Sequence, residues 1–251
     1  MRRRSAAAGA LAVLFALAPG GARAADACAP LSFSDAPYVV CRFDARRDDI
    51  RLYWKDADGE PYAGFAALAQ ALAARGRTLR FAMNAGMFED DLSPVGLYVE
   101  DGKRRRKADT REGESNFHLK PNGVFWIGDG SAGVTETSRF LANPPPARYA
   151  TQSGPMLVID GRIHPQILPT GTSEKIRNGV CVRDGAAAIF AISERPVTFY
   201  AFARLFLEAL GCSDALFLDG SVSSLYAPER DRDDDFSPLG PMIGVSVPAK
   251  P

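Results

Sequence analysis

The sequence predicts an α+β protein, built as a single domain on an antiparallel or mixed β-sheet with a few flanking helices. Many short apolar runs are separated by turn signals such as Asp-Gly, which is typical of hairpins. Only two segments have clear helical periodicity, so the strict strand–helix alternation of a doubly wound fold is absent. With 30 basic against 30 acidic residues in 251, the composition is globular and gives no electrostatic case for nucleic-acid binding.

The N-terminal segment has the order of regions found in a secretory signal peptide, predicted over residues 1–24. Three arginines at positions 2–4 precede an apolar run over residues 6–18, and small residues follow. This run is too short to span a bilayer, and no later one approaches the ~20 residues required. We expect an exported protein, periplasmic or secreted, whose mature domain is 25–251. A buried N-terminal helix, twin-arginine export and a lipid-modified Cys28 are the alternatives.

The first elements of the mature chain are expected to be strands around one helix. The helix is predicted because Phe65, Leu68, Ala69 and Leu72 recur at helical spacing, and Gly76 stands where a C-terminal cap belongs. The apolar runs expected to form strands in this part are 38–43, 50–54, 79–83 and 95–99.

The middle of the chain continues with strands and connectors. Asp101-Gly102 predicts a turn, and the basic run 103–107 is interpreted as a solvated strand or turn. A strand is expected at 123–127, and the three prolines at 144–146 require an extended connector. A hairpin follows over residues 156–163.

The last third is expected to hold a hairpin, a helix and two strands. The hairpin strands 178–182 and 186–192 flank an Arg-Asp-Gly turn. The helix begins near Thr198 and stops at Gly211. Its buried side chains are predicted to be Phe202, Leu205, Phe206 and Ala209. The runs at 215–218 and 243–247 are the two remaining strands.

Four cysteines form an even set in an exported protein, so disulfides are the default expectation. Of three possible pairings, we favour Cys28–Cys41, which ties down the mature N-terminus, and Cys181–Cys212, which joins two predicted elements. Only two histidines and no C-x-x-C spacing occur, so a structural zinc site is not expected. No cofactor is expected, although the acidic residues near Asp219 could hold calcium.

Polar or glycine-rich clusters border four of the apolar strands, where a rigid scaffold presents reactive groups. They span residues 84–88, 116–123, 152–157 and 219–224. Each one alone is also ordinary turn chemistry. No phosphate-binding loop, H-E-x-x-H helix or G-x-S-x-G elbow is present.

Taken in order, the motifs N-A-G-M-F, P-N-G-V-F, S-G-P-M-L, R-N-G-V and L-F-L-D-G-S resemble the phosphodiester glycosidase family. The resemblance covers roughly residues 80–247 and is strongest to bacterial exported members related to the uncovering-enzyme domain. The family usually shows N-G-G-x-F and D-G-G-G-S, whereas Ala85 replaces one glycine here and the segment after Asp219 has fewer glycines. The resemblance implies hydrolysis of a sugar-1-phosphodiester at the glycosidic carbon, which releases the sugar and a phosphomonoester.

This implied chemistry suggests roles for three residues. Arg177 would bind the phosphate with its guanidinium fork. Asp219 would act as a base or stabilise the sugar cation, and His118 would move a proton or bind phosphate. The alternative, purely structural roles are a surface ion pair of Arg177 with Glu174, a turn cap by Asp219 and a packing role for His118. Substrate-binding candidates are Asn84, Gly86, Asn122, Ser153, Gly154, Gly220, Ser221 and Ser223.

The second carboxylate of a two-carboxylate mechanism is not identified by the motifs, and the unranked candidates are Glu112, Glu114, Glu174 and Glu194. The substrate is expected to be a small-molecule or polymeric glycan phosphodiester, and the oligomeric state is left open. Two rival functions remain: a non-catalytic glycan-binding or envelope protein on the same fold, and a phosphodiesterase that cleaves the P–O bond.

Overall fold

The computed structural model describes residues 27–250, so the predicted signal peptide lies outside the described residues. The strands in chain order are β1 (Cys28–Phe33), β2 (Ala36–Asp44), β3 (Ile50–Tyr53), β4 (Arg77–Asn84), β5 (Tyr98–Glu100), β6 (Lys103–Arg106), β7 (Gly123–Gly128), β8 (Ser131–Glu136), β9 (Tyr149–Ser153), β10 (Met156–Ile159), β11 (Arg162–Ile163), β12 (Glu174–Lys175), β13 (Asn178–Arg183), β14 (Ala187–Ser193), β15 (Val197–Thr198), β16 (Ala215–Asp219), β17 (Leu225–Ala227), β18 (Arg232–Asp233) and β19 (Met242–Pro248). The helical segments are α1 (Phe65–Ala73), η1 (Asn116–His118), α2 (Thr137–Ala142), α3 (Phe199–Arg204), η2 (Leu205–Ala209) and η3 (Pro228–Arg230).

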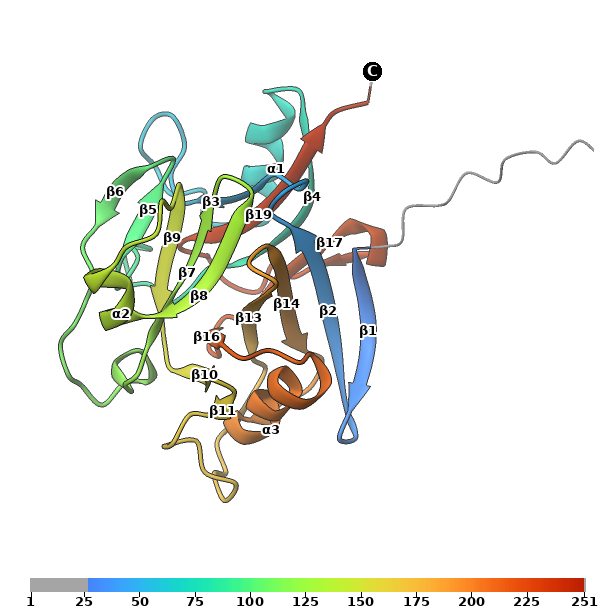
Figure 1. The fold of residues 1–251 in the computed structure, drawn as a ribbon. Helices are drawn as coiled ribbons and strands as arrows, with labels where there is room; N and C mark the ends of the chain where they lie inside the picture. The colour runs from blue at the N-terminus through green and yellow to red at the C-terminus, as the bar shows by residue number, and fades with distance from the viewer. Residues whose placement is uncertain (1–26, 251) are drawn as a thin grey trace, which may run out of the picture.

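Most of the strands form three sheets, which surround a common interior (Figure 1). A seven-stranded sheet has the order β1-β2-β14-β13-β16-β10-β11, and two five-stranded sheets have the orders β18-β17-β4-β19-β3 and β6-β5-β9-β7-β8. Neighbouring strands in these sheets are antiparallel, as the hairpin signals predict. The fold is therefore mostly β with few helices, a more β-rich form of the predicted α+β class.

Aromatic side chains from different sheets meet at the centre of the largest hydrophobic core. The Phe81 ring of β4 lies 4.9 Å from Phe43 of β2 and 5.0 Å from Phe190 of β14, measured between centroids. Phe125 of β7 lies 5.8 Å from Phe190. All four rings are buried, so the three sheets share one apolar interior whose burial is a major source of stability.

The second predicted helix begins as expected but has a different register at its end. The Thr198 hydroxyl accepts a hydrogen bond from the Ala201 N–H, which caps α3. The chain then widens into the π-helical segment η2, where the Leu210 N–H bonds to the Leu205 carbonyl. This extra residue per turn buries Leu210 and leaves Ala209 exposed, so the prediction that Ala209 is buried is wrong.

The strand predicted at 95–99 is shorter than expected, because only its last residues join β5. The Leu97 N–H donates to the side-chain Oε1 of Gln152 instead of to a neighbouring strand. A Cβ at Gly96 would lie 2.4 Å from the same Oε1 atom. The Gln152 side chain thus takes the place of one backbone acceptor, while the Gln152 N–H of β9 still donates to the Leu97 carbonyl at 2.9 Å. The helix α2 and the strands β1, β8, β9, β12, β15, β17 and β18 were not predicted.

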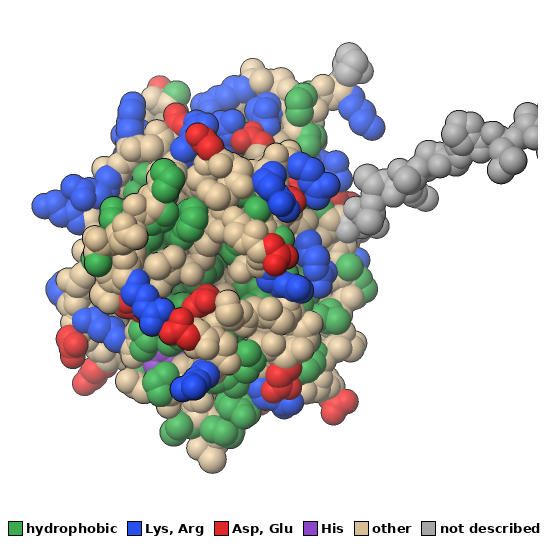
Figure 2. All heavy atoms as spheres, in the orientation of Figure 1, with side chains coloured by type: hydrophobic (Ala, Val, Ile, Leu, Met, Phe, Trp, Pro, Cys, Tyr) green, Lys and Arg blue, Asp and Glu red, His purple; other side chains and the backbone are tan. Residues whose placement is uncertain are grey.

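The basic run after Asp101-Gly102 forms β6, the outer strand of its sheet. All four side chains of Lys103–Arg106 are exposed, as expected for a solvated strand. On the face drawn in Figure 2, Lys and Arg side chains are spread over the whole face, with Asp and Glu side chains among them. No helix within residues 27–250 is long and apolar enough to cross a membrane.

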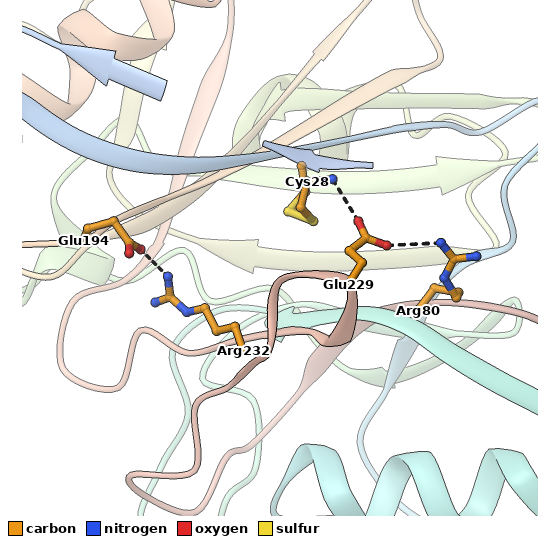
Figure 3. The surroundings of a disulfide bond; sticks show 6 residues. Cys28, Arg80, Glu194, Glu229 and Arg232 are labelled. Carbon is orange, nitrogen blue, oxygen red and sulfur yellow. Dashed lines mark hydrogen bonds and ion pairs between the residues drawn. A yellow bond between two sulfur atoms is a disulfide. The ribbon is translucent and has the colours of Figure 1, made fainter. Parts of the chain in front are cut away.

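Both favoured disulfides are confirmed. Cys28 and Cys41 are opposite each other in the β1–β2 ladder, and Cys181 of β13 joins Cys212, which follows η2. Figure 3 shows how the first disulfide is anchored: the Cys28 N–H donates to Glu229 Oε1 at 3.1 Å, and Arg80 Nη2 donates to Glu229 Oε2 at 3.1 Å. The start of the described chain is thereby fastened to η3 and β4.

Replacing the Cys181–Cys212 pair by serines should lower the free energy of unfolding by about 2–4 kcal/mol. The matched control is the same replacement of Cys28–Cys41. The sequence separation is 31 residues for Cys181–Cys212 and 13 residues for Cys28–Cys41. Loop entropy alone therefore makes the loss of unfolding free energy larger for the Cys181–Cys212 variant, by about 0.8 kcal/mol. Urea unfolding of both variants measures the difference. An equal or reversed order would contradict the loop-entropy account.

Candidate functional site

Asp219 ends β16, an inner strand of the seven-stranded sheet, and begins the segment 219–224, here named the Asp219 loop. Its Oδ1 accepts the backbone N–H groups of Gly220 and Ser221, both at 2.6 Å, and that of Val222 at 3.4 Å. Oδ2 has no hydrogen bond with a described residue. One carboxylate oxygen is therefore fixed by the loop backbone, and the other is available to a ligand.

The pKa of Asp219 reflects two opposing influences. The residue is only 5% exposed, and burial raises the pKa because it disfavours the charged carboxylate. The backbone N–H groups that bond to Oδ1 lower the pKa, but burial is the larger influence and the pKa is raised overall. Proton transfer is most efficient when the pKa of the catalytic group lies near the working pH. The raised pKa of Asp219 is a shift in that direction.

Two buried asparagines from other strands hold the Asp219 loop in place. The Asp219 N–H donates to Asn178 Oδ1 at 2.9 Å, and Asn178 Nδ2 donates to Asn84 Oδ1 at 2.6 Å. Asn84 Oδ1 also accepts the Ser224 N–H at 2.9 Å. Asn84 ends β4 and Asn178 begins β13, so this network connects two sheets. Asn178 belongs to the R-N-G-V motif, but sequence reasoning assigned it no role.

Arg177 is buried, and the alternative of a surface pair with Glu174 is wrong. Its Nε donates to the Val197 carbonyl at 2.9 Å and its Nη2 to the Ser173 carbonyl at 2.8 Å. The guanidinium carbon lies 3.6 Å from the Phe199 ring centroid. Burial lowers the pKa of Arg177 to about 10, which leaves it charged at neutral pH.

No carboxylate within residues 27–250 forms an ion pair with Arg177, and Nη1 makes no hydrogen bond to a described residue. A buried cation without a counterion is costly unless an anion can reach it. The burial of Arg177 without a carboxylate partner among the described residues therefore fits a binding site for an anionic ligand.

Arg177 and Asp219 line the same cavity, named here the main cavity, with a volume of about 500 Å³. This volume lies within the usual range for small-molecule sites. Further charged or titratable side chains in its wall are Glu89, Arg111, His118 and Lys175. Cationic groups and carboxylates thus face one space, as a reaction at a phosphodiester would require.

His118 lies at the end of η1, where the buried Phe117 anchors the turn. Its Nδ1 is 2.8 Å from the Ser115 hydroxyl, and its Nε2 is 3.5 Å from Asp109 Oδ2. Arg111 donates to the same carboxylate and, as the largest cause, holds the pKa of Asp109 well below its usual range. The Ser115 hydroxyl and the Asp109 carboxylate therefore orient the His118 ring, so His118 does more than pack against its neighbours.

Of the predicted substrate-binding residues, Gly220 and Ser221 line the main cavity, Ser223 lines a smaller cavity beside it, and the others line neither cavity. Asn122 Nδ2 donates to the Phe117 carbonyl at 2.9 Å, and Ser153 Oγ donates to the Leu218 carbonyl at 2.9 Å. The Ser223 hydroxyl donates to the Asp219 carbonyl at 3.0 Å. These side chains shape the site through internal hydrogen bonds.

Two predicted glycines, Gly86 and Gly154, do not line the main cavity but make close contacts with neighbouring segments. A Cβ at Gly154 would lie 2.7 Å from both Asn122 Cβ and the Phe117 carbonyl oxygen. A Cβ at Gly86 would lie 3.3 Å from the Gln152 carbonyl oxygen, and its φ of 137° disfavours other residues. Both glycines therefore allow tight packing of these segments.

Sequence reasoning missed Glu89 as a carboxylate of the site. The four glutamates that it proposed do not line the main cavity: Glu112, Glu114, Glu174 and Glu194. Glu112 is 91% exposed at its side chain, and Glu194 pairs with Arg232. Glu89 directly follows the N-A-G-M-F motif, so reading one residue beyond the motif would have found it.

Metal-binding side chains do not cluster within the part of the chain that the structure describes: no group of three or more His, Cys, Asp or Glu side chains is suitably placed. In the acidic run 231–235, Asp234 bonds to Arg232 and to the Leu225 N–H. A calcium ion near Asp219 would therefore need ligands beyond a preformed carboxylate cluster.

The Asp219→Asn variant should be at least as stable as the wild type at pH 7. Because burial raises the folded-state pKa of Asp219, its contribution to stability is present below the unfolded-state pKa and lost as pH rises through the folded-state pKa. The amide avoids this loss, and its Oδ1 can still accept the loop N–H groups. Urea unfolding at pH 7 and pH 4 measures the effect, and the gap should close at pH 4. A wild type more stable than the variant at pH 7 would refute this account.

Comparisons with known proteins agree with the motifs. A phosphodiester glycosidase family model matches residues 77–246. The uncharacterised protein YigE of Escherichia coli K12 is 34% identical over 212 residues, which cover 84% of this chain and 82% of that protein.

Solved structures share the fold. The catalytic domain of zebrafish N-acetylglucosamine-1-phosphodiester alpha-N-acetylglucosaminidase, auto-inhibited by its pro-peptide, has a TM-score of 0.60 at 13% identity and covers 87% of this chain and 81% of its own. A hypothetical protein from Synechocystis has a TM-score of 0.57 at 14% identity, over 88% of this chain and 61% of its own. With the family match over most of the sequence and this shared fold, the chain belongs to the phosphodiester glycosidase family.

Proposed function

We propose that the protein is an exported hydrolase that cleaves the glycosidic bond of a sugar-1-phosphodiester and releases the sugar and a phosphomonoester. The observation that carries this proposal is that Arg177 and Asp219 line the same cavity. The buried guanidinium suits the phosphate, and the buried carboxylate suits the sugar carbon that reacts. The two disulfides support a location outside the cytosol.

The phosphate group binds at the cationic side of the main cavity. Arg177 offers its Nη1 to the phosphate oxygens, and Lys175 and Arg111 add positive charge. When the glycosidic bond breaks, negative charge develops on the departing phosphate. Preorganised cations then stabilise the transition state more than the ground state, which accelerates the reaction. A phosphate leaving group is already acidic, so it needs little help from a general acid.

Asp219 acts at the sugar. Its Oδ1 is held by the loop N–H groups, which leaves Oδ2 to stabilise positive charge on the anomeric carbon or to accept a proton from the attacking water. Glu89 is the second carboxylate of the proposed site, and His118 relays a proton or contacts the phosphate. These steps use only side chains of the chain. Calcium remains a hypothesis, which turnover with and without EGTA tests.

The substrate to try first follows from the structural relative, whose name describes an N-acetylglucosamine-1-phosphodiester. UDP-N-acetylglucosamine and a panel of other sugar-1-phosphodiesters serve as substrates, and mass spectrometry identifies the products. Free sugar supports the proposal when it appears together with UDP from the sugar nucleotide or with an intact phosphomonoester from the other substrates. Sugar-1-phosphate indicates P–O cleavage by a phosphodiesterase, and binding without turnover indicates a glycan-binding protein.

Substitutions at the two principal residues should reduce turnover by different routes. Asp219→Asn should lower kcat by ~10²–10⁴-fold, the usual contribution of a catalytic acid or base. Arg177→Lys keeps the charge but loses the fork, and should lower kcat/KM by about 10–100-fold, since a hydrogen bond to a charged group contributes about 1.5–3 kcal/mol. Steady-state kinetics and thermal unfolding are measured together. Wild-type kinetics in either variant would remove that residue from the mechanism.

Glu89 can be tested against a glutamate outside the cavity. Glu89→Gln should lower kcat by ~10²-fold if it is the second carboxylate. Glu112→Gln is the matched control, because the Glu112 side chain is 91% exposed and forms a surface ion pair with Lys120. The control should retain wild-type kinetics. Equal activity of the two variants would leave Asp219 as the only carboxylate of the proposed mechanism.

A further inference from the structure

A second cavity of about 290 Å³ adjoins the main cavity. The two share Gly220, Ser221 and Val222 as wall residues, so this part of the Asp219 loop forms a ridge between them. The volume is close to the ~300 Å³ at the lower end of small-ligand sites. A ligand bound at the phosphate side of the ridge can therefore extend into a neighbouring space that fits about one ring.

The charged side chains of the second cavity are paired with one another. Arg232 bonds to Glu194 on one side and to Asp234, at 2.9 Å, on the other; Figure 3 shows its pairing with Glu194. Two carboxylates thus surround one guanidinium, in contrast to Arg177, which has no carboxylate partner among the described residues. A phosphate would meet net negative charge here, and both carboxylates are already paired with Arg232, so the second cavity favours an uncharged ligand.

The remaining wall combines hydroxyl groups with an exposed aromatic ring. Ser223, Ser224 and Ser237 line the cavity together with Phe236. Phe236 is 79% exposed, the highest value among the large hydrophobic side chains that the structure describes as exposed. A solvent-exposed phenyl ring in the wall of a polar cavity can stack against a ligand that occupies the cavity. Its negative face attracts the slightly positive C–H groups of a pyranose ring. The Ser223 and Ser224 hydroxyls already donate to backbone carbonyls, so they can accept hydrogen bonds from sugar hydroxyls.

We propose that the second cavity binds a neutral sugar ring, stacked on Phe236, next to the phosphodiester held by Arg177. The placement of this ring relative to the scissile bond rests on the proposed function, whereas the binding of a neutral sugar does not. The substrate is then a glycan phosphodiester with at least one further sugar, and a single-sugar nucleotide fills only part of the site. Under this proposal, the main cavity with Arg177 holds the phosphate, and the second cavity, with more acidic than basic side chains, holds the neutral ring.

The test measures sugar binding without requiring turnover. A panel of neutral mono- and disaccharides of glucose, N-acetylglucosamine and mannose is titrated against the wild type and Asp219→Asn, with saturation-transfer NMR as the readout. Asp219 lines only the main cavity, so at least one sugar should bind both proteins. Phe236→Ala should weaken this binding by about tenfold, and Phe236→Tyr should retain it because the aromatic face remains.

The matched control is Leu168→Ala, since Leu168 is 58% exposed and does not line the second cavity. It should bind the sugars as the wild type does. Inorganic phosphate should not displace them, because it binds beyond the ridge. No binding of any panel member, equal binding by Phe236→Ala, or displacement by phosphate would overturn the inference. Failure of the proposed function appears separately, as absence of turnover by the wild type on the phosphodiester panel.

Discussion

The hydrogen bonds of the Asn178 carboxamide are the constraint on which the site depends. Through this one side chain, β13 contacts both the start of the Asp219 loop and the end of β4. Asn178, Asn84 and Ser224 are all buried, so water cannot replace the lost partners if one is removed. The position of the Asp219 carboxylate is therefore set by the packing of two sheets and does not depend on the loop alone.

The site also concentrates charges that work against stability. Arg177 and Asp219 are both buried, and neither has an ionic partner within the described residues. Such groups are retained where they serve a ligand, because a protein optimised only for stability would pair or replace them. The surrounding structure tolerates the cost by supplying carbonyl groups to Arg177 and N–H groups to Asp219. The rings of Phe199 and Phe217 also face the guanidinium.

Much of the fold could be predicted, because hairpin turns and apolar runs are local signals. Likewise, the motif order correctly indicated the family, and Arg177 and Asp219 do face one cavity. The role of Asn178 could not be predicted, since it depends on strands that are distant in the sequence. Glu89 lies in a loop without periodicity, and Ala209 was misplaced because a π-helical turn has no simple sequence pattern. The site thus depends on contacts between strands that are distant in the sequence as much as on local motifs.

The basic strand β6 has a consequence for how the protein behaves at high concentration. As the outer strand of its sheet, it presents unpaired backbone groups to which a strand from another molecule could add. A second copy that approached this edge with its own β6 would place Lys103–Arg106 of both molecules side by side, and the like charges would repel. The same four side chains that make the strand solvent-exposed therefore keep the sheet from growing between molecules.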